Sequence, residues 1–261
     1  MEIIGYIAAF FMGVTLGSIG GGGSILTVPI LVYLMGVSPV IATGYSLLIV
    51  GSAASIGAFR YYRKGQINVR AAITFAIASI VSVYVTRLYI MPSIPDILIQ
   101  SPITVTKDSF IMVLFAFLMV ASSIMLFVNS RKLADANPQS PHYGLVAITA
   151  LGVGLMTGIL GAGGGFLIIP SLVLLMQIPM KKAVGTSLLI IAINSSVGFI
   201  GDMQRGETLE FPMLAYFFAA TAIGMVLATM VSHHFDGKKL QQFFALFTVV
   251  VATIIFVKEL F

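Results

Sequence analysis

Long apolar stretches separated by short polar connections dominate this sequence, and they determine what the chain can fold into. A helix that spans a bilayer needs about 20 mostly apolar residues, and eight stretches approach that length. Charged residues make up 9% of the chain, against about a quarter in an average soluble domain. So few charges cannot coat a water-facing surface, which excludes an ordinary soluble enzyme, a coiled coil and a disordered chain. The sequence therefore predicts an all-α, polytopic integral membrane protein in a lipid bilayer. The eight stretches are 3–19, 40–59, 69–90, 109–128, 144–160, 183–200, 211–231 and 240–257.

Two shorter apolar pieces, 25–37 and 166–178, each follow a glycine cluster and carry an early proline, Pro29 or Pro170. At about 1.5 Å per helical residue, each piece reaches roughly 20 Å, which is short of a full span. We therefore expect broken or re-entrant helices, with the two prolines marking the breaks. Each proline could begin its short helix or kink a helix that begins at the end of the glycine cluster. A strained or unwound entry is favoured, because both pieces retain the proline.

The chain contains an internal duplication with an offset of 141 residues. Between 17–48 and 158–189, 15 of 32 pairs are identical. Each half has five apolar elements, and because five is odd the second half is predicted to be inverted relative to the first, as in many transporters. We assign 1–128 to the first transmembrane repeat, 129–143 to a cytoplasmic linker and 144–261 to the second, inverted repeat.

Basic clusters mark the connections that the positive-inside rule places in the cytoplasm. Both termini are then expected outside, as is the connection 201–210, where acidic residues outnumber basic ones. The first apolar stretch is expected to be a permanent span rather than a cleaved signal peptide, because no basic segment precedes it. The clustered basic residues are Arg60, Arg63, Lys64, Arg70, Arg131, Lys132, Lys181, Lys182, Lys238 and Lys239.

The two glycine clusters are the leading candidates for a binding site. In a bilayer, non-helical backbone survives only when it is buried in protein or lines a wet cavity. Inversion would bring the clusters face to face, with the N–H groups of the restarting helices directed into the space between them. Such N–H groups and the helix dipole favour an anion, although the glycines could instead serve only close helix packing. The candidate residues are Gly20, Gly21, Gly22, Gly23, Ser24, Gly161, Gly163, Gly164 and Gly165.

Hydroxyl-bearing segments at matching places in the two repeats form the second set of candidates. Their hydroxyls could donate to a bound oxyanion or could join helices to one another. Asn194 corresponds to Ala53 and therefore breaks the symmetry, either as a ligand of an asymmetric site or as a packing contact. The segments contribute Thr43, Gly44, Ser46, Gly185, Thr186 and Ser187.

Ionisable residues are expected at the ends of spans and in loops. No acidic residue lies in the middle of a predicted span, which counts against a proton relay or a cation site. Arg87 lies about one turn inside its apolar stretch and is expected to snorkel to the interface, with an anion-attracting outer vestibule as the alternative. Arg60 and Arg205 are expected to anchor their spans. The histidines are expected to be solvated loop residues, so neither a metal nor a cofactor is predicted; they are His142, His233 and His234.

These motifs carry a resemblance to the sulfite exporter TauE/SafE family. Gly17, the glycines of the first cluster and Pro29, followed by the Ala-Thr-Gly-Tyr-Ser-Leu of 42–47, resemble the first half of the family pattern. The second half is closer to it, with its glycines, Pro170 and the Ala-Val-Gly-Thr-Ser-Leu of 183–188. The departures are Thr43-Gly44-Tyr45 and Val184, where the family more often has a Gly-Thr-Ser run after Ala. The resemblance covers essentially the whole chain.

The resemblance implies transport of a small sulfur-containing anion such as sulfite, sulfoacetate or a related organosulfonate, usually outward across a prokaryotic plasma (inner) membrane. The leading hypothesis is a secondary transporter that works by alternating access of inverted repeats. The alternatives are a passive anion channel and an uptake permease for a different small oxyanion. An enzyme is disfavoured because Ser and Tyr alone lack the base that a nucleophile needs. The basic residues form no stripe, so no nucleic-acid partner is expected; the oligomeric state stays open.

Overall fold

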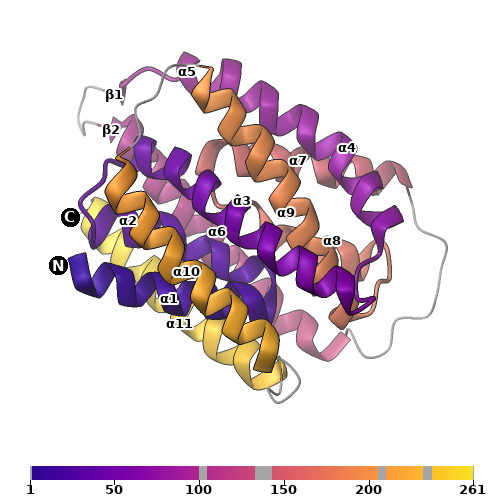
Figure 1. Ribbon diagram of the computed structural model, residues 1–261. Helices are drawn as coiled ribbons and strands as arrows, with labels where there is room; N and C mark the ends of the chain where they lie inside the picture. The colour runs from indigo at the N-terminus through magenta and orange to yellow at the C-terminus, as the bar shows by residue number, and fades with distance from the viewer. Residues whose placement is uncertain (1, 100–104, 133–142, 205–209, 232–236, 261) are drawn as a thin grey trace.

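The chain folds into a bundle of helices, seen in a computed structural model that describes residues 2–99, 105–132, 143–204, 210–231 and 237–260. Both termini lie at the end of the bundle that carries β1 and β2 (Figure 1). The elements in chain order are α1 (Glu2–Ile19), η1 (Gly21–Leu26), α2 (Thr27–Tyr33), α3 (Pro39–Arg63), α4 (Val69–Val85), η2 (Thr86–Ile90), α5 (Met91–Ser93), β1 (Ile97–Ile99), β2 (Val105–Thr106), α6 (Lys107–Lys132), α7 (Tyr143–Leu160), α8 (Gly165–Leu174), α9 (Met180–Met203), α10 (Phe211–Val231) and α11 (Gly237–Leu260).

All eight predicted long stretches are helical, and the prediction of an all-α polytopic membrane protein is confirmed. Among the described residues, six helices are long and apolar enough to cross a membrane. The apolar run of α7, Gly144–Leu160, is shorter, as are the two pieces that follow the glycines. The six are Glu2–Ile19, Pro39–Arg63, Val69–Ser93, Lys107–Ile124, Met180–Met203 and Phe211–Met230.

Apolar side chains form stripes on the outside of the bundle. On α4, Ile73, Ile77 and Val81 are 52%, 64% and 57% exposed, whereas Phe75 and Ser79 are fully buried. Because residues four apart share a helix face, the exposed apolar residues lie on one side of α4 and the small or packed residues on the other. A continuous apolar outer surface of this kind suits lipid and would be a liability in water.

Helix packing follows the internal duplication. α1 packs along α10, and the matching helices α7 and α4 pack along one another in the same way. Gly13 of α1 lies so close to the Thr221 backbone that no Cβ would fit, and Gly154, which is 141 residues later, meets the Ser79 backbone in the same manner. The two repeats are therefore interleaved, with each of the long helices α1, α3, α4 and α6 lying against a helix of the other repeat.

The equivalent helices α3 and α9 pack together in the centre and run antiparallel (Figure 1). Tyr61, near the end of α3, contacts Gly185, near the start of α9, whereas Gly51 in the middle of α3 contacts Ser195, much further along α9. Antiparallel equivalents are what an inverted repeat requires. The sidedness of the repeats in a membrane stays a prediction.

The short helices α2 and α8 end in the same way. Gly36 follows α2 with a φ of 75°, and Gln177 occupies the equivalent place after α8 with a φ of 52°. In each case the next backbone N–H donates to the carbonyl oxygen six residues back, at 3.0 Å in the first repeat and 3.1 Å in the second. This is the left-handed helix ending that usually takes glycine.

The helices break at the glycines rather than at the prolines. Gly20 has a φ of 76° and Gly164 a φ of 63°, which is left-handed backbone that a right-handed helix cannot continue through. Pro29 is the third residue of α2 and Pro170 lies inside α8, so the assignment of these prolines as the breaks is corrected. Pro29 lies in the first turn of α2 and is tolerated there because its missing N–H would have no helical partner. In the second repeat the helix begins at Gly165, whereas the first repeat enters through the 3₁₀ helix η1.

Two connections differ in how far the structure describes them. The connection between α5 and α6 contains an antiparallel pair of short strands in which Ile97 lies opposite Thr106. In the predicted linker, α6 reaches Lys132 and α7 begins at Tyr143, while 133–142 lies outside the described residues.

Candidate functional site

The structure brings the two glycine clusters together in the interior. Gly21 begins η1 and Gly165 begins α8, and a Cβ on either residue would collide with the backbone of the other. Every candidate residue of both clusters is buried. The backbone segments that interrupt the two helices therefore meet in the protein core, 144 positions apart in the sequence (165 − 21).

Each glycine break also lies against the hydroxyl-bearing segment of the other repeat. A Cβ at Gly20 would come within 2.8 Å of the Ser187 hydroxyl and 3.2 Å of the Val184 carbonyl oxygen. Gly161, with a φ of 69°, lies against the backbone of Thr43, which is the equivalent of Val184. The two sets of predicted site residues thus lie together, with the glycine break of each repeat against the hydroxyl-bearing segment of the other.

The predicted hydroxyls differ in whether they already have partners. Ser24 donates to the Gly21 carbonyl at 2.7 Å, and Ser187 donates to the Val184 carbonyl at 2.8 Å. Backbone carbonyls within a turn are common partners for such side chains. These two hydroxyls are therefore used locally, although Ser187 stays in contact with Gly20.

Thr186 and Gly185 lie at the connection between α3 and α4, where they serve packing. The Thr186 hydroxyl donates to the Lys182 backbone carbonyl oxygen at 2.6 Å and accepts from the Asn68 backbone N–H at 2.9 Å. In the other repeat the Tyr45 hydroxyl accepts from the Glu210 backbone N–H at 3.1 Å, in the matching position. Gly44 is buried in the turn that carries Tyr45. These contacts hold the starts of α4 and α10.

Among the uncharged side chains, four buried polar atoms have no hydrogen-bond partner in the described residues: Ser46 Oγ, Thr157 Oγ1, Asn194 Nδ2 and Ser195 Oγ. The Asn194 Oδ1 accepts from the Ser79 hydroxyl at 3.0 Å, so only its N–H₂ group lacks a partner in the described structure. An unsatisfied buried donor costs about 1–3 kcal/mol, which makes such atoms uncommon outside binding sites. These donors are therefore candidates for contacts with a polar ligand or ordered water.

Two of these four were not among the predicted site residues. Thr157 lies against Gly164, and Ser195 Oγ lies 3.3 Å from the place of a Cβ on Gly163. Both therefore adjoin the second glycine cluster. The available signals were local: Thr157 lies one helical turn before the break, and Ser195 follows Asn194 directly.

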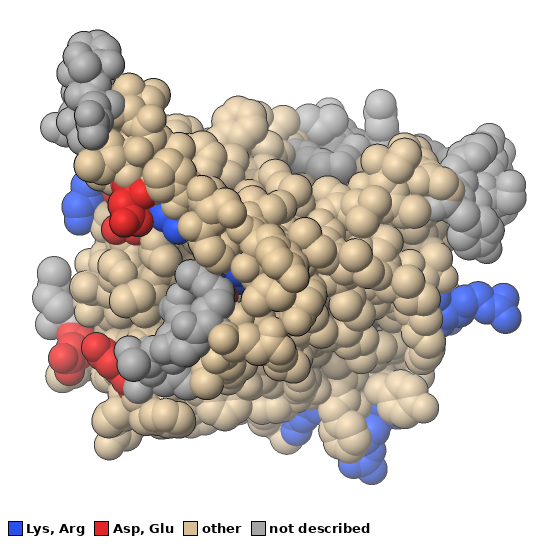
Figure 2. Space-filling view, turned by 90° about the horizontal axis from the view of Figure 1, so that it is seen from above, with Lys and Arg blue, Asp and Glu red and all other residues tan. Residues whose placement is uncertain are grey.

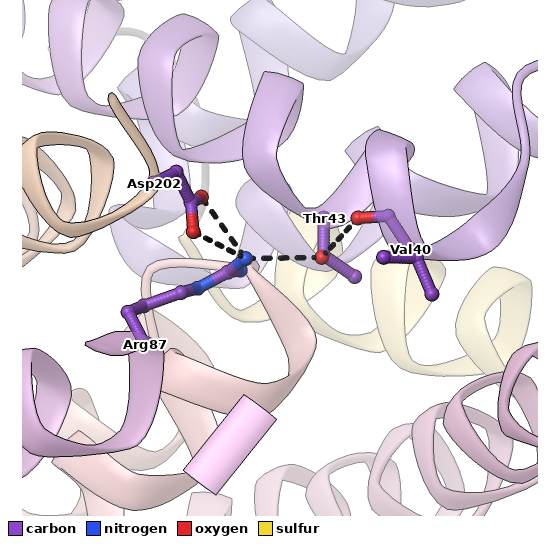
Figure 3. A network of polar contacts seen from close by, with 4 residues as sticks. All are labelled: Val40, Thr43, Arg87 and Asp202. Carbon is purple, nitrogen blue, oxygen red and sulfur yellow. Dashed lines mark hydrogen bonds and ion pairs between the residues drawn. The ribbon is translucent and has the colours of Figure 1, made fainter. Parts of the chain in front are cut away.

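A buried ion pair lies beside Thr43 (Figure 3). Arg87 Nη1 lies 3.0 Å from Asp202 Oδ2 and 3.3 Å from Oδ1, and it donates to the Thr43 hydroxyl at 3.2 Å. The Thr43 hydroxyl donates in turn to the Val40 carbonyl at 2.7 Å. The Arg87 and Asp202 side chains are 2% and 4% exposed.

The ion pair overturns two predictions. Arg87 does not snorkel to the interface, because a carboxylate from the second repeat meets it in the interior. Asp202 belongs to the last turn of α9 rather than to an exposed acidic connection. Sequence reasoning missed the pair because its members come from different repeats, 115 residues apart.

Other predicted charges lie at the ends of the bundle. Arg60 donates to the Val226 carbonyl and the Thr229 hydroxyl, each at 2.8 Å, and so ties α3 to α10; its role as an anchor of the span stays a prediction. On the face shown in Figure 2, acidic side chains lie toward the end that carries the termini, and only basic ones show at the opposite end. Arg205 and the three histidines lie outside the described residues. Among the residues that the structure describes, no group of three or more His, Cys, Asp or Glu side chains could hold a metal ion.

The fold and site define a multi-pass membrane protein with a polar site in its interior. The family model for the sulfite exporter TauE/SafE matches residues 5–255, and the chain belongs to that family. It is 28% identical over 250 residues to a "Probable membrane transporter protein" of Xylella fastidiosa (strain 9a5c), covering 92% of this chain and 89% of the relative. It is 27% identical over 235 residues to the "Probable membrane transporter protein YunE" of Bacillus subtilis (strain 168), covering 79% and 78%. No solved structure matches. The chain is thus a membrane transporter, from a family of transporters rather than enzymes.

Proposed function

We propose that this protein is a secondary transporter that exports a small sulfur-containing anion, such as sulfite, sulfoacetate or a related organosulfonate. It acts in a prokaryotic plasma (inner) membrane, with both termini outside, by alternating access between the inverted repeats 1–128 and 144–261. The observation that carries the proposal is the meeting of the two glycine clusters, at Gly21 and Gly165, beside buried donors that have no partner among the described residues.

The chemistry of the site favours an anion. Ser46, Thr157, Ser195 and the Asn194 N–H₂ group can all donate hydrogen bonds to an oxyanion. The ten-residue helix α8 begins at Gly165, and the N-terminal end of its dipole adds a partial positive charge. The sulfur in the substrate comes from the family alone, whose name is that of a sulfite exporter.

The proposal is tested by sulfite flux into proteoliposomes made with purified protein. We expect saturable flux, because a carrier must bind substrate before each transport cycle. Flux that stays linear to high concentration would favour the passive channel, and absence of flux with sulfite, sulfoacetate and sulfate would refute the proposal.

A pair of glycine variants locates the site. In Gly163→Leu, the new Cβ would lie 2.8 Å from the Ile191 side chain on backbone with a φ of 66°, so flux should be abolished. The matched control is Gly152→Leu, because Gly152 is exposed and has no atom within 4 Å of its Cβ position. Thermal unfolding in detergent separates loss of transport from loss of fold. Equal flux in the two variants would contradict the assignment.

A further inference from the structure

The Arg87–Asp202 pair is placed where it can take part in substrate binding. Arg87 belongs to η2, a π-helical turn that follows α4, and π-helical turns within helices are frequent at functional sites. Its Nη1 lies between the carboxylate of Asp202 and the hydroxyl of Thr43 (Figure 3). The backbone of Thr43 in turn contacts Gly161, where the second glycine cluster begins. Thr43 alone therefore separates the positively charged guanidinium of Arg87 from Gly161 of the second glycine cluster.

We infer that Arg87 is the residue that binds the charge of the transported anion, and that Asp202 is its resident counter-ion, which the anion replaces. This inference rests on the proposed function. A guanidinium binds oxyanions through N–H groups in a fixed plane, and a carboxylate, a sulfite and a sulfonate all present oxygens that match it. Asp202 already holds such an oxygen 3.0 Å from Nη1, in the place that a substrate oxygen would take.

The burial of the pair explains why a counter-ion is needed. A buried charge without a partner is strongly destabilising, so an anion-binding arginine in the interior requires a carboxylate when no substrate is present. The carboxylate also sets a threshold for binding, because an incoming anion has to compete with it. Asp202 is thus expected to weaken substrate binding and Arg87 to strengthen it.

The pair also links binding to the relative position of the repeats. Arg87 comes from the first repeat and Asp202 from the end of α9 in the second, so the ion pair ties η2 to α9. At the opposite end of α3, Arg60 donates to the hydroxyl of the neutral Thr229, one residue beyond Ala228, which is the equivalent of Arg87 at the offset of 141 residues. Of these two places, only the first therefore joins the repeats by an ion pair. Replacement of Asp202 by the anion would release α9 from η2.

The test measures sulfite binding by purified protein, with sulfite flux and unfolding temperature recorded for each variant. Arg87→Gln should raise the sulfite Kd by about tenfold or more, because a charge-assisted hydrogen bond is lost. Asp202→Asn should lower it by roughly three- to tenfold, because a competing carboxylate is removed. The matched control is Arg63→Gln, an exposed arginine on α3, which should leave the Kd unchanged.

The double variant separates a binding role from a structural one. Each single variant leaves one partner of a buried pair and should lower the unfolding temperature, whereas Arg87→Gln/Asp202→Asn removes both charges and should recover most of it. Its sulfite Kd should nevertheless stay raised. A wild-type Kd in the double variant, or weakening by Asp202→Asn equal to that of Arg87→Gln, would overturn the inference and leave the pair structural. A wild-type protein that binds none of sulfite, sulfoacetate and sulfate would overturn the proposed function together with it.

Discussion

Removal of the Ser195 hydroxyl should change stability and substrate affinity in opposite directions. Its Oγ is buried beside Gly163 and has no hydrogen-bond partner among the described residues. Taking such a group out of water without a partner costs about 1–3 kcal/mol, so Ser195→Ala should leave the substrate-free protein equally stable or more stable, by up to ~1 kcal/mol. A hydrogen bond to a bound anion contributes about 1.5–3 kcal/mol, so its loss should raise the sulfite Kd roughly 10- to 100-fold.

The control for this prediction is another buried serine whose hydroxyl is satisfied. Ser123 donates to the Ala245 carbonyl at 2.7 Å and joins α6 to α11. Ser123→Ala should lower the free energy of unfolding by about 1 kcal/mol and leave the sulfite Kd unchanged. The assay is thermal unfolding in detergent, without sulfite and with increasing sulfite. If Ser195→Ala lost stability as Ser123→Ala does and kept the wild-type Kd, the assignment of Ser195 to the site would be refuted.

Two further predictions concern topology and backbone. The chain has no cysteine, so single cysteines at Gln66 and Glu210 can be labelled in membranes of known orientation. Gln66→Cys should react from the cytoplasmic side and Glu210→Cys from outside. Labelling of both from the same side would contradict the inverted repeat. Gly36→Ala should lower the free energy of unfolding by about 1 kcal/mol, because its φ is 75° and no atom lies near its Cβ position. Gly152→Ala, equally open but helical, should raise it by roughly 0.5–1 kcal/mol, and equal effects in thermal unfolding would disprove the backbone argument.

Much of the fold was predictable because lipid imposes a simple rule on sequence. Long apolar stretches have to become helices when water is absent, so the helices could be located from composition alone. The duplication followed from glycines at equal spacing, and Gly13 and Gly154 show how that spacing becomes matched packing against α10 and α4. The strands β1 and β2 carry no comparable signal, because two- and three-residue strands are set by tertiary contacts.

The site was predictable in its backbone and less so in its side chains. Runs of glycine indicate left-handed or closely approached backbone wherever they occur, and Gly20 and Gly161 have it. Whether a hydroxyl is satisfied depends on neighbours that sequence spacing does not reveal, which is why Thr186 proved to hold α4 while Thr157 lies beside Gly164. The prediction that Arg87 snorkels to the interface was wrong for the same reason, since its partner Asp202 comes from the other repeat.

If the repeats are inverted as proposed, their departures from symmetry are what directional transport needs. Strictly equivalent halves would present the same site to both sides of the membrane and so give identical affinities outside and inside. Here Gly20 and its equivalent Gly161 both have left-handed backbone and the helix endings are matched, whereas Asn194 corresponds to Ala53 and Arg87 to Ala228. In the proposed alternating-access cycle, the matched backbone would allow the two halves to exchange conformations, and the unmatched side chains would make the two end states differ in energy and in their contacts with an anion. Directional preference therefore has to come from the unmatched residues, which are where substitutions should change the ratio of affinities on the two sides.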